Sequence, residues 1–310
     1  MNEAPSIHIP ERTFGLKIDF EKGSESPERV FTAMTELITA TRNTDRTLIQ
    51  GVSGDIKTIL LLEDIEIGSV TAILRTILKA TDDNALKDGD WKKILGNYLL
   101  CAKYAILRNF PEKNEGITKQ SIGAIQETII HAAEQTGAAA LPFYHPPSIP
   151  EIIDSISNYQ QAVQHLGERE TASILDQNGE RISIPKIADY SRETAIAALR
   201  EKEFSNELQA MLGVKKPDYL GRSRWSFVYD GKTIEAPILH ETWLARFQNR
   251  EIDVRPGDAL RVIIRVTVTY GSGSNVLNTR HEVLEVIEVD RSQPEPRLIN
   301  VTPKPARKSS

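Results

Sequence analysis

The chain has 310 residues, a formal net charge of -5 at pH 7 and a single cysteine, Cys101. One cysteine excludes an internal disulfide framework and favours a reducing compartment. The chain has no signal-peptide pattern and no apolar run near the ~20 residues that span a bilayer, so we expect a cytoplasmic protein without membrane contact. This length is too great for one small hydrophobic core, and two or three domains are expected.

The charge is unevenly distributed along the chain. Residues 220–310 contain 14 Lys and Arg against 11 Asp and Glu, whereas residues 1–219 contain 24 against 32. The C-terminal part is therefore mildly basic and the N-terminal part is acidic. This asymmetry keeps nucleic acid open as a partner of the C-terminal part.

The N-terminal part is predicted to alternate strands and helices. Residues 14–20 alternate apolar and polar side chains, which is the pattern of a strand with one buried face. Residues 26–28 (Ser-Pro-Glu) are typical of a helix start. The apolar run at 55–67 predicts a second strand, and apolar spacings of three and four residues at 68–80 predict a second helix. This order indicates an α/β layer with helices on one sheet face.

The middle of the chain is predicted to be mainly helical. One helix is expected at 91–107, which places Cys101 in a buried helix interior, and another at 118–136. The four prolines of residues 141–150 cannot continue a helix and indicate the end of the N-terminal domain. Beyond them the pattern predicts a helix, a hairpin around an Asn-Gly turn and a further helix, at 151–166, 173–184 and 191–204.

Residues 224–289 have the pattern of a small β-barrel. Aromatic and β-branched residues lead into Asp230-Gly231, a dipeptide typical of tight hairpins. Apolar side chains at helical spacing within 241–247 predict one short helix that covers the open end of the barrel. Strands are predicted at 211–215, 224–229, 232–239, 260–269 and 276–289.

The predicted fold class is therefore α+β. It combines an N-terminal α/β sandwich-like domain, a helical connecting region and a C-terminal small β-barrel of the SH3/OB-like kind with five strands. The corresponding residues are 1–140, 141–210 (the connector, which includes the hairpin) and 211–292. Residues 293–310 are predicted to form a disordered tail because they are rich in proline and charge.

Several short runs carry a resemblance to a known family. They are Lys-Pro-Asp-Tyr-Leu-Gly at 216–221, Trp-Ser-Phe at 225–227, Trp-Leu-Ala-Arg-Phe-Gln at 243–248 and Arg-Pro-Gly-Asp at 255–258, together with Leu-Glu-Asp-Ile-Glu-Ile-Gly-Ser at 62–69. The chain thereby resembles a family of uncharacterised bacterial proteins with an N-terminal α/β domain and a C-terminal five-stranded β-barrel. The resemblance implies a bacterial origin and a two-module plan, and it implies no activity.

Five carboxylates, Asp19, Asp55, Glu63, Asp64 and Glu66, lie on or beside the two predicted N-terminal strands. Metal-dependent nucleases hold a cation between acids of adjacent strands with a lysine nearby, but the spacing in this chain does not match that arrangement. We expect solvent-facing acids, and whether they form a site stays open. The histidines and the glycine-rich segments also lack the spacing of a zinc, calcium or phosphate site. No catalytic residue, metal or cofactor is predicted.

The predicted barrel offers a basic and aromatic face of the composition that holds phosphates and stacks bases. An alternative is that strand glutamates pair with these arginines, the candidates being Glu235, Glu282, Glu285 and Glu288. The candidate binding residues are Arg222, Arg224, Trp225, Tyr229, Arg261, Arg265 and Tyr270, with Arg280 near them.

The absence of a catalytic constellation favours a non-enzymatic interaction or regulatory protein, which binds a protein partner through the barrel or the N-terminal domain. The alternative is a nucleic-acid-binding, nuclease-like component of a bacterial mobile-element or defence system. The sequence leaves the partner, the pathway and the oligomeric state open.

Overall fold

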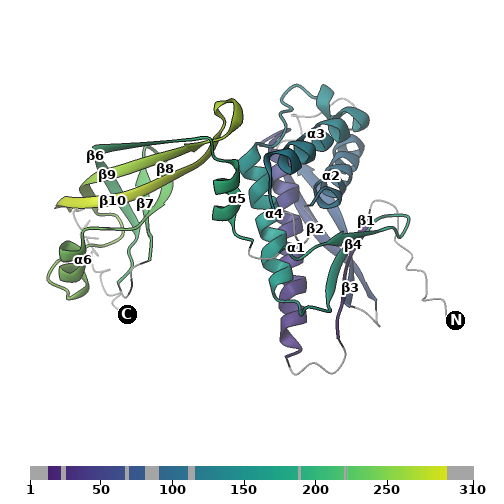
Figure 1. The fold of residues 1–310 in the computed structure, drawn as a ribbon, viewed down its shortest axis with the longest axis horizontal. Helices are drawn as coiled ribbons and strands as arrows, with labels where there is room; N and C mark the ends of the chain where they lie inside the picture. Colours follow the sequence, from purple (N-terminus) through teal and green to yellow (C-terminus); the bar gives the residue numbers. More distant parts are fainter. Residues whose placement is uncertain are drawn as a thin grey trace, which may run out of the picture. The chain divides into compact units, whose positions relative to one another are not determined.

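The computed structural model describes residues 13–21, 26–66, 70–80, 91–110, 116–187, 190–219, 221 and 223–291. Within these residues there are six α-helices and two five-stranded antiparallel sheets (Figure 1). The chain divides into two compact units, the first formed by Met1–Glu201 with Tyr270–Leu277 and the second by Lys202–Thr269 with Asn278–Ser310. The domain boundaries at 140, 210 and 292 stay predictions, and the predicted tail at 293–310 lies outside the described residues.

The first unit contains a sheet with the strand order β2-β3-β1-β4-β5. The central strand pairs with β3 on one side and with β4 on the other, both antiparallel. The strands are β1 (Thr13–Asp19), β2 (Ile56–Glu66), β3 (Val70–Ala80), β4 (Thr171–Leu175) and β5 (Arg181–Ile184).

Burial explains why β1 is central. Its alternate residues Phe14, Leu16 and Ile18 are all 0% exposed, so one face of the strand lies in the main core. The alternation seen in the sequence predicted this strand, and the prediction is confirmed. The hairpin β4–β5, which the sequence pattern places in the connecting region, extends the same sheet beyond β1.

The helix predicted at 68–80 is wrong, because the described part of this segment is the strand β3. Val70, Ile73 and Ile77 are β-branched and fit a pleated sheet better than a helix. An apolar spacing of three and four residues in a segment this rich in Ile, Leu and Val does not exclude a strand. Pairing with β2 on one side and β1 on the other decides the outcome, so the expected strand-helix alternation is replaced by two consecutive antiparallel strands.

Helices cover the core of the first unit. Helix α1 packs against α4 and against β1 and β2, and α2 packs against α3. Figure 1 shows α1 and α4 side by side. The five helices of this unit are α1 (Glu28–Gln50), α2 (Trp91–Arg108), α3 (Lys119–Thr136), α4 (Ile149–Gln164) and α5 (Arg192–Leu199). None of the helices in the described ranges is both long enough and apolar enough to cross a membrane.

Two details of the helices differ from expectation. Helix α4 begins inside the proline-rich stretch, because Ser148 and Glu151 form a capping box and Pro150 falls in the first turn, where proline is tolerated. Cys101 on α2 is exposed, so the predicted burial of this thiol is wrong, although partial desolvation still raises the pKa of the thiol.

A close backbone approach follows the end of α1. The carbonyl of Gly51 accepts a hydrogen bond from the amide of His145 at 2.7 Å, and a Cβ atom on Gly51 would lie 2.5 Å from the carbonyl oxygen of His145. We expect Gly51→Ala to lower the free energy of unfolding by about 1–3 kcal/mol, because two backbone segments must separate. Urea unfolding followed by circular dichroism measures the change.

Gly54→Ala is the matched control, because among the described residues, its two chain neighbours aside, no heavy atom lies within 4 Å of its added Cβ. Equal stability of the two variants would contradict the predicted clash.

The second unit contains a curled sheet with the strand order β10-β9-β6-β7-β8. Ile238, which follows β8, forms an isolated parallel bridge with Val283 of β10. The amide of Leu239 donates to Val283 O at 2.8 Å, and the amide of Val283 donates to Pro237 O at 3.0 Å. The curl therefore brings its two edges together at one point. The strands are β6 (Lys202–Lys216), β7 (Trp225–Tyr229), β8 (Lys232–Ala236), β9 (Ala259–Tyr270) and β10 (Val276–Asp290).

Helix α6 (Glu241–Gln248) packs on the core of this sheet through Trp243, Leu244 and Phe247. The Trp225 ring lies 4.8 Å from the Phe247 ring and 6.0 Å from the Trp243 ring, measured between centroids. The short helix predicted here is confirmed. The helix predicted at 191–204 is too long, since α5 ends at Leu199 and β6 begins three residues later.

Candidate functional site

The structure places the three aromatic residues of the predicted basic and aromatic face in different surroundings. Trp225 is 1% exposed and belongs to the core of the second unit, so its ring is not available at the surface. Tyr229 is half-buried and packs edge-on against His281 with ring centroids 6.2 Å apart. Tyr270 belongs to the first unit, where its carbonyl accepts the amide of Glu201 at 2.8 Å. Arg222 lies outside the described residues.

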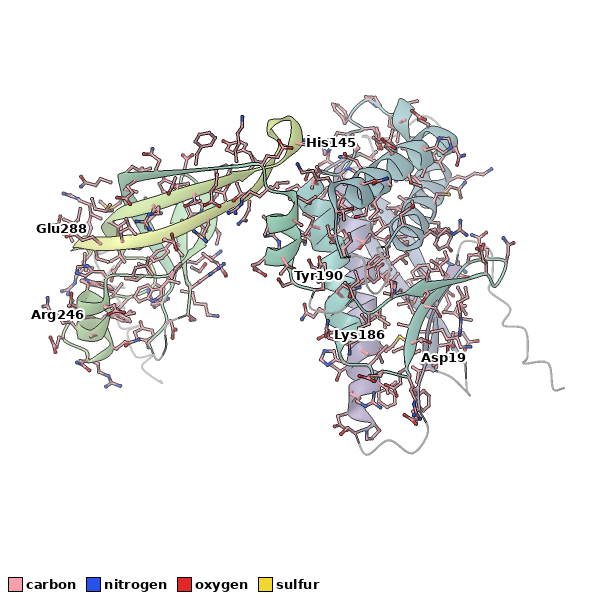
Figure 2. All side chains as sticks on the ribbon, viewed as in Figure 1. Asp19, His145, Lys186, Tyr190, Arg246 and Glu288 are labelled. Carbon is pink, nitrogen blue, oxygen red and sulfur yellow. The ribbon has the colours of Figure 1, made fainter. Side chains whose placement is uncertain are left out.

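The strand arginines of this face pair with carboxylates. Arg265 donates to Glu207 through Nε at 3.0 Å and Nη2 at 2.7 Å. Arg261 lies 3.4 Å from Glu288, near the end of β10 in Figure 2. Glu282 lies 3.8 Å from both Arg265 and Arg280. Such exposed pairs contribute little to stability, but they neutralise the positive charge that a phosphate backbone requires. Arg224 is exposed and forms no ion pair with the described residues.

The five N-terminal carboxylates occupy separate places. Asp19, at the end of β1 in Figure 2, pairs with Lys17 and Arg181. Glu63 lies 3.1 Å from Arg75 Nε, and Asp64 Oδ1 accepts the amide of the next residue at 2.7 Å. Asp55 lies just before β2, and the side chain of Glu66 is not described. In the described ranges no group of three or more His, Cys, Asp or Glu is arranged to hold a metal ion.

A buried ion pair in the first unit was not predicted from the sequence. Lys103 on α2 and Asp45 on α1 have side chains that are 0% and 1% exposed, with Nζ 2.9 Å from Oδ1. Nζ donates a hydrogen bond to Oδ2 at 3.2 Å, and the hydroxyl of Thr76 on β3 donates to the same oxygen at 2.6 Å. Nζ also lies 4.0 Å from the centroid of the Phe14 ring, which is close enough for a cation–π contact.

The role of the Asp45–Lys103 pair is structural. Burial lowers the pKa of Lys103, and the neighbouring carboxylate of Asp45 opposes that change. The amine has no exposed surface, so no substrate reaches it in this conformation. A cavity of about 260 Å³ lies between β3 and α2, and Thr76 lines it. The pair thus links α1, α2 and β3. The sequence feature that could have indicated this pair is that Asp45 and Lys103 lie among the buried residues of their helices.

A second charged cluster joins the loop before β4 to α1. Arg29 holds Glu170 with two hydrogen bonds, one of them 2.8 Å long between Nη2 and Oε1. The amides of Glu21 and Gly167 donate to the same carboxylate at 2.9 and 2.7 Å. These donors, with Arg29 the largest contribution, lower the pKa of Glu170 to about 2. A cavity of about 350 Å³ adjoins it, but the carboxylate is already engaged by four donors and does not offer a free base.

An exposed apolar patch lies at the edge of the first sheet. Ile59 and Leu61 on β2 are 41% and 38% exposed, and Ile77 on β3 is 39% exposed. Ile59 stands directly opposite Ile77 in the ladder, so the three side chains share the face turned away from the main core. We call Ile59, Leu61 and Ile77 the β2 patch. Because β2 is the last strand in the order of the sheet, one of its edges is unpaired within the described residues.

Comparisons with protein-family models, with curated proteins and with solved structures find no match for this chain. The resemblance to a bacterial family with a C-terminal barrel stays a prediction. The fold and its surfaces define the class of the chain, which is a mixed α+β protein with two antiparallel sheets.

Proposed function

We propose that this chain is a non-enzymatic interaction protein that binds an extended segment of a partner protein along strand β2. The observation that carries the proposal is the β2 patch beside a strand edge that has no partner strand among the described residues. An exposed strand edge presents backbone donors and acceptors to an added strand, and alternate apolar side chains give such an addition its specificity.

Charge next to the β2 patch indicates the chemistry of the partner segment. Lys57 and Lys79 face each other directly in the ladder, and neither forms an ion pair with the described residues. Like charges in this position repel each other. A partner segment with an acidic residue at this point would relieve the repulsion, and its apolar residues would cover Ile59 and Leu61. The partner segment is therefore an extended one with alternating apolar residues and an acid at one end.

The open part of the edge is short. A register shift between Leu62 and Asp64 interrupts the ladder, and Glu63 at this point pairs with Arg75. Bulges and charges of this kind protect strand edges from indiscriminate pairing. Residues 56–62 are consequently the segment that accepts a partner strand.

The proposal is tested with Ile59→Lys, which introduces a charge into the β2 patch. The tagged 310-residue chain captures its partner from a lysate, and mass spectrometry identifies the protein. We expect Ile59→Lys to lose that partner, and we expect amides within 56–62 to exchange hydrogen more slowly in the purified complex. Ile287→Lys is the matched control, because Ile287 is 49% exposed and lies on the edge strand of the other sheet.

Three outcomes would overturn the proposal. The first is that Ile59→Lys still binds the partner. The second is that hydrogen exchange at 56–62 is the same in the complex as in the free chain. The third is that every protein captured by the unmodified chain is also captured by Ile59→Lys. If the native mass of the chain alone shows a dimer that Ile59→Lys abolishes, the occupant of the edge is a second copy and not a foreign partner.

Three finer expectations belong to the same proposal. They are that the curled sheet is a barrel of the SH3/OB-like kind, that the chain has separate N-terminal and C-terminal domains, and that it works in the cytoplasm. The bridge between Ile238 and Val283 supports the first of these. Nucleic acid receives no comparable support, because Arg261 and Arg265 already face glutamates.

A further inference from the structure

The second unit contains a cavity beside the end of α6 that the proposed function does not use. Its volume is about 550 Å³, within the range of about 300–1,000 Å³ typical of small-molecule sites. Two arginines, two aromatic rings and an amide share its wall. The lining residues are Tyr219, Phe247, Gln248, Arg250, Ile252, Asp253 and Arg255.

Hydrogen bonds brace the wall of this cavity. The hydroxyl of Tyr219 donates to Val254 O at 3.1 Å, and the Tyr219 ring lies on Phe247 with centroids 5.1 Å apart and planes at 30°. Gln248 Nε2 donates to Gly221 O at 2.6 Å. The ring of Tyr219 is therefore held in place although the residue is 51% exposed. A fixed, exposed aromatic ring is a platform on which a planar group can stack.

The arginines of the cavity differ in their partners. Arg255 pairs with Asp253, with Nη2 2.7 Å from Oδ2. Arg250 is exposed and forms no ion pair with the described residues. The two arginines and one aspartate leave the lining with a positive charge. A guanidinium without a carboxylate partner is free to bind a phosphate with two parallel hydrogen bonds.

The backbone of Arg250 is the second, independent observation. Helix α6 ends with hydrogen bonds from the amide of Arg250 to Phe247 O and from the amide of Glu251 to Arg246 O. This pattern places Arg250 at the position that glycine usually occupies, and its φ of 63° is left-handed. An arginine there keeps a strained backbone where glycine would relieve it. Residues retained in such conformations cluster at binding sites.

We propose that this cavity binds a phosphate monoester that carries a planar ring, the chemistry of a mononucleotide. The phosphate lies against the guanidinium of Arg250, with Arg255 next to it, and the ring stacks on Tyr219. A favourable contact between a cation and the carboxyl end of α6 is the competing reason for an arginine at this position. The variants below separate the two reasons.

The full chain is titrated with AMP and UMP, and with adenosine and inorganic phosphate as separate arms, by calorimetry at low salt. We expect AMP to bind measurably at about 1 mM and more weakly as salt increases. Arg250→Gly should weaken AMP binding by at least about tenfold while raising the midpoint of thermal unfolding. Tyr219→Ala should weaken AMP and adenosine and leave inorganic phosphate unchanged.

Arg246→Ala is the matched control. Arg246 lies on the last turn of the same helix (Figure 2) but does not line the cavity. Its loss removes a cation from the helix end, and its 3.4 Å pair with Glu251, without removing a residue of the cavity wall. AMP affinity should stay within about twofold of that of the unmodified chain.

Several results would overturn the proposal. One is the absence of heat from AMP and UMP at about 1 mM. Another is full affinity in Arg250→Gly, and a third is an equal loss of affinity in Arg246→Ala and Arg250→Gly. Binding of inorganic phosphate that is as tight as that of AMP would remove the ring from the proposal.

Discussion

Asp45→Ala is expected to lower the free energy of unfolding of the chain by about 3–5 kcal/mol, because it leaves the ammonium of Lys103 buried without its carboxylate. The residues of the pair are 1% and 0% exposed, so water does not replace the lost partner. Urea unfolding at pH 7, followed by circular dichroism, measures the loss. The hydroxyl of Thr76 also loses the carboxylate oxygen to which it donates.

Two further variants separate the ion pair from simple loss of volume. Asp45→Leu combined with Lys103→Met replaces both charges by apolar groups of similar size, and we expect much of the stability to return, because the desolvation cost of the ions disappears. Asp154→Ala breaks an exposed pair with Arg192 and should have little effect. A double variant as unstable as Asp45→Ala would contradict this account.

Glu170→Gln is expected to have an effect that depends on pH. The pKa of Glu170 is lowered to about 2 in the folded chain, below the ordinary value of about 4.3 for glutamate. The ionised carboxylate therefore stabilises the fold above about pH 4.3, and this contribution is lost as the pH falls toward 2. A pKa difference of this size corresponds to about 3 kcal/mol, which is an upper figure because Arg29 is partly exposed.

Urea unfolding of the unmodified chain and of Glu170→Gln from pH 7 down to about 2 tests this linkage. We expect the stability difference between them to be largest near neutral pH and to shrink below about pH 4.3. Glu180→Gln is the control, since Glu180 pairs with Arg108 at the surface and should show only a small difference. A difference between Glu170→Gln and the unmodified chain that is independent of pH would show that the carboxylate charge is not the cause.

The success of the strand predictions depended on how local the signal was. In β1 and β9 fully buried apolar residues alternate with smaller, more polar or less buried ones, so the period of two is visible along the chain itself. β3 also has partners on both sides, but its Val, Ile and Leu residues do not alternate with polar ones, and their spacings fitted a helix equally well. The apolar spacing alone did not distinguish the two periods, and pairing with the neighbouring strands decided between them.

The candidate sites were less accessible to prediction than the fold. The buried pair joins residues 58 positions apart, and Arg29 and Glu170 are 141 positions apart. Each of these side chains resembles many other charged residues in the sequence. The φ of Arg250 is likewise set by the end of α6 and by no motif.

By itself, the sequence of this protein determined where most strands, helix starts and tight turns lie, because propensity, capping and apolar alternation depend on residues a few positions apart. Only the tertiary structure decided that residues 70–80 form a strand, that Trp225 lies in a core and that Asp45 meets Lys103. These outcomes depend on contacts between distant segments, whose free energy is set by burial and charge in the folded chain.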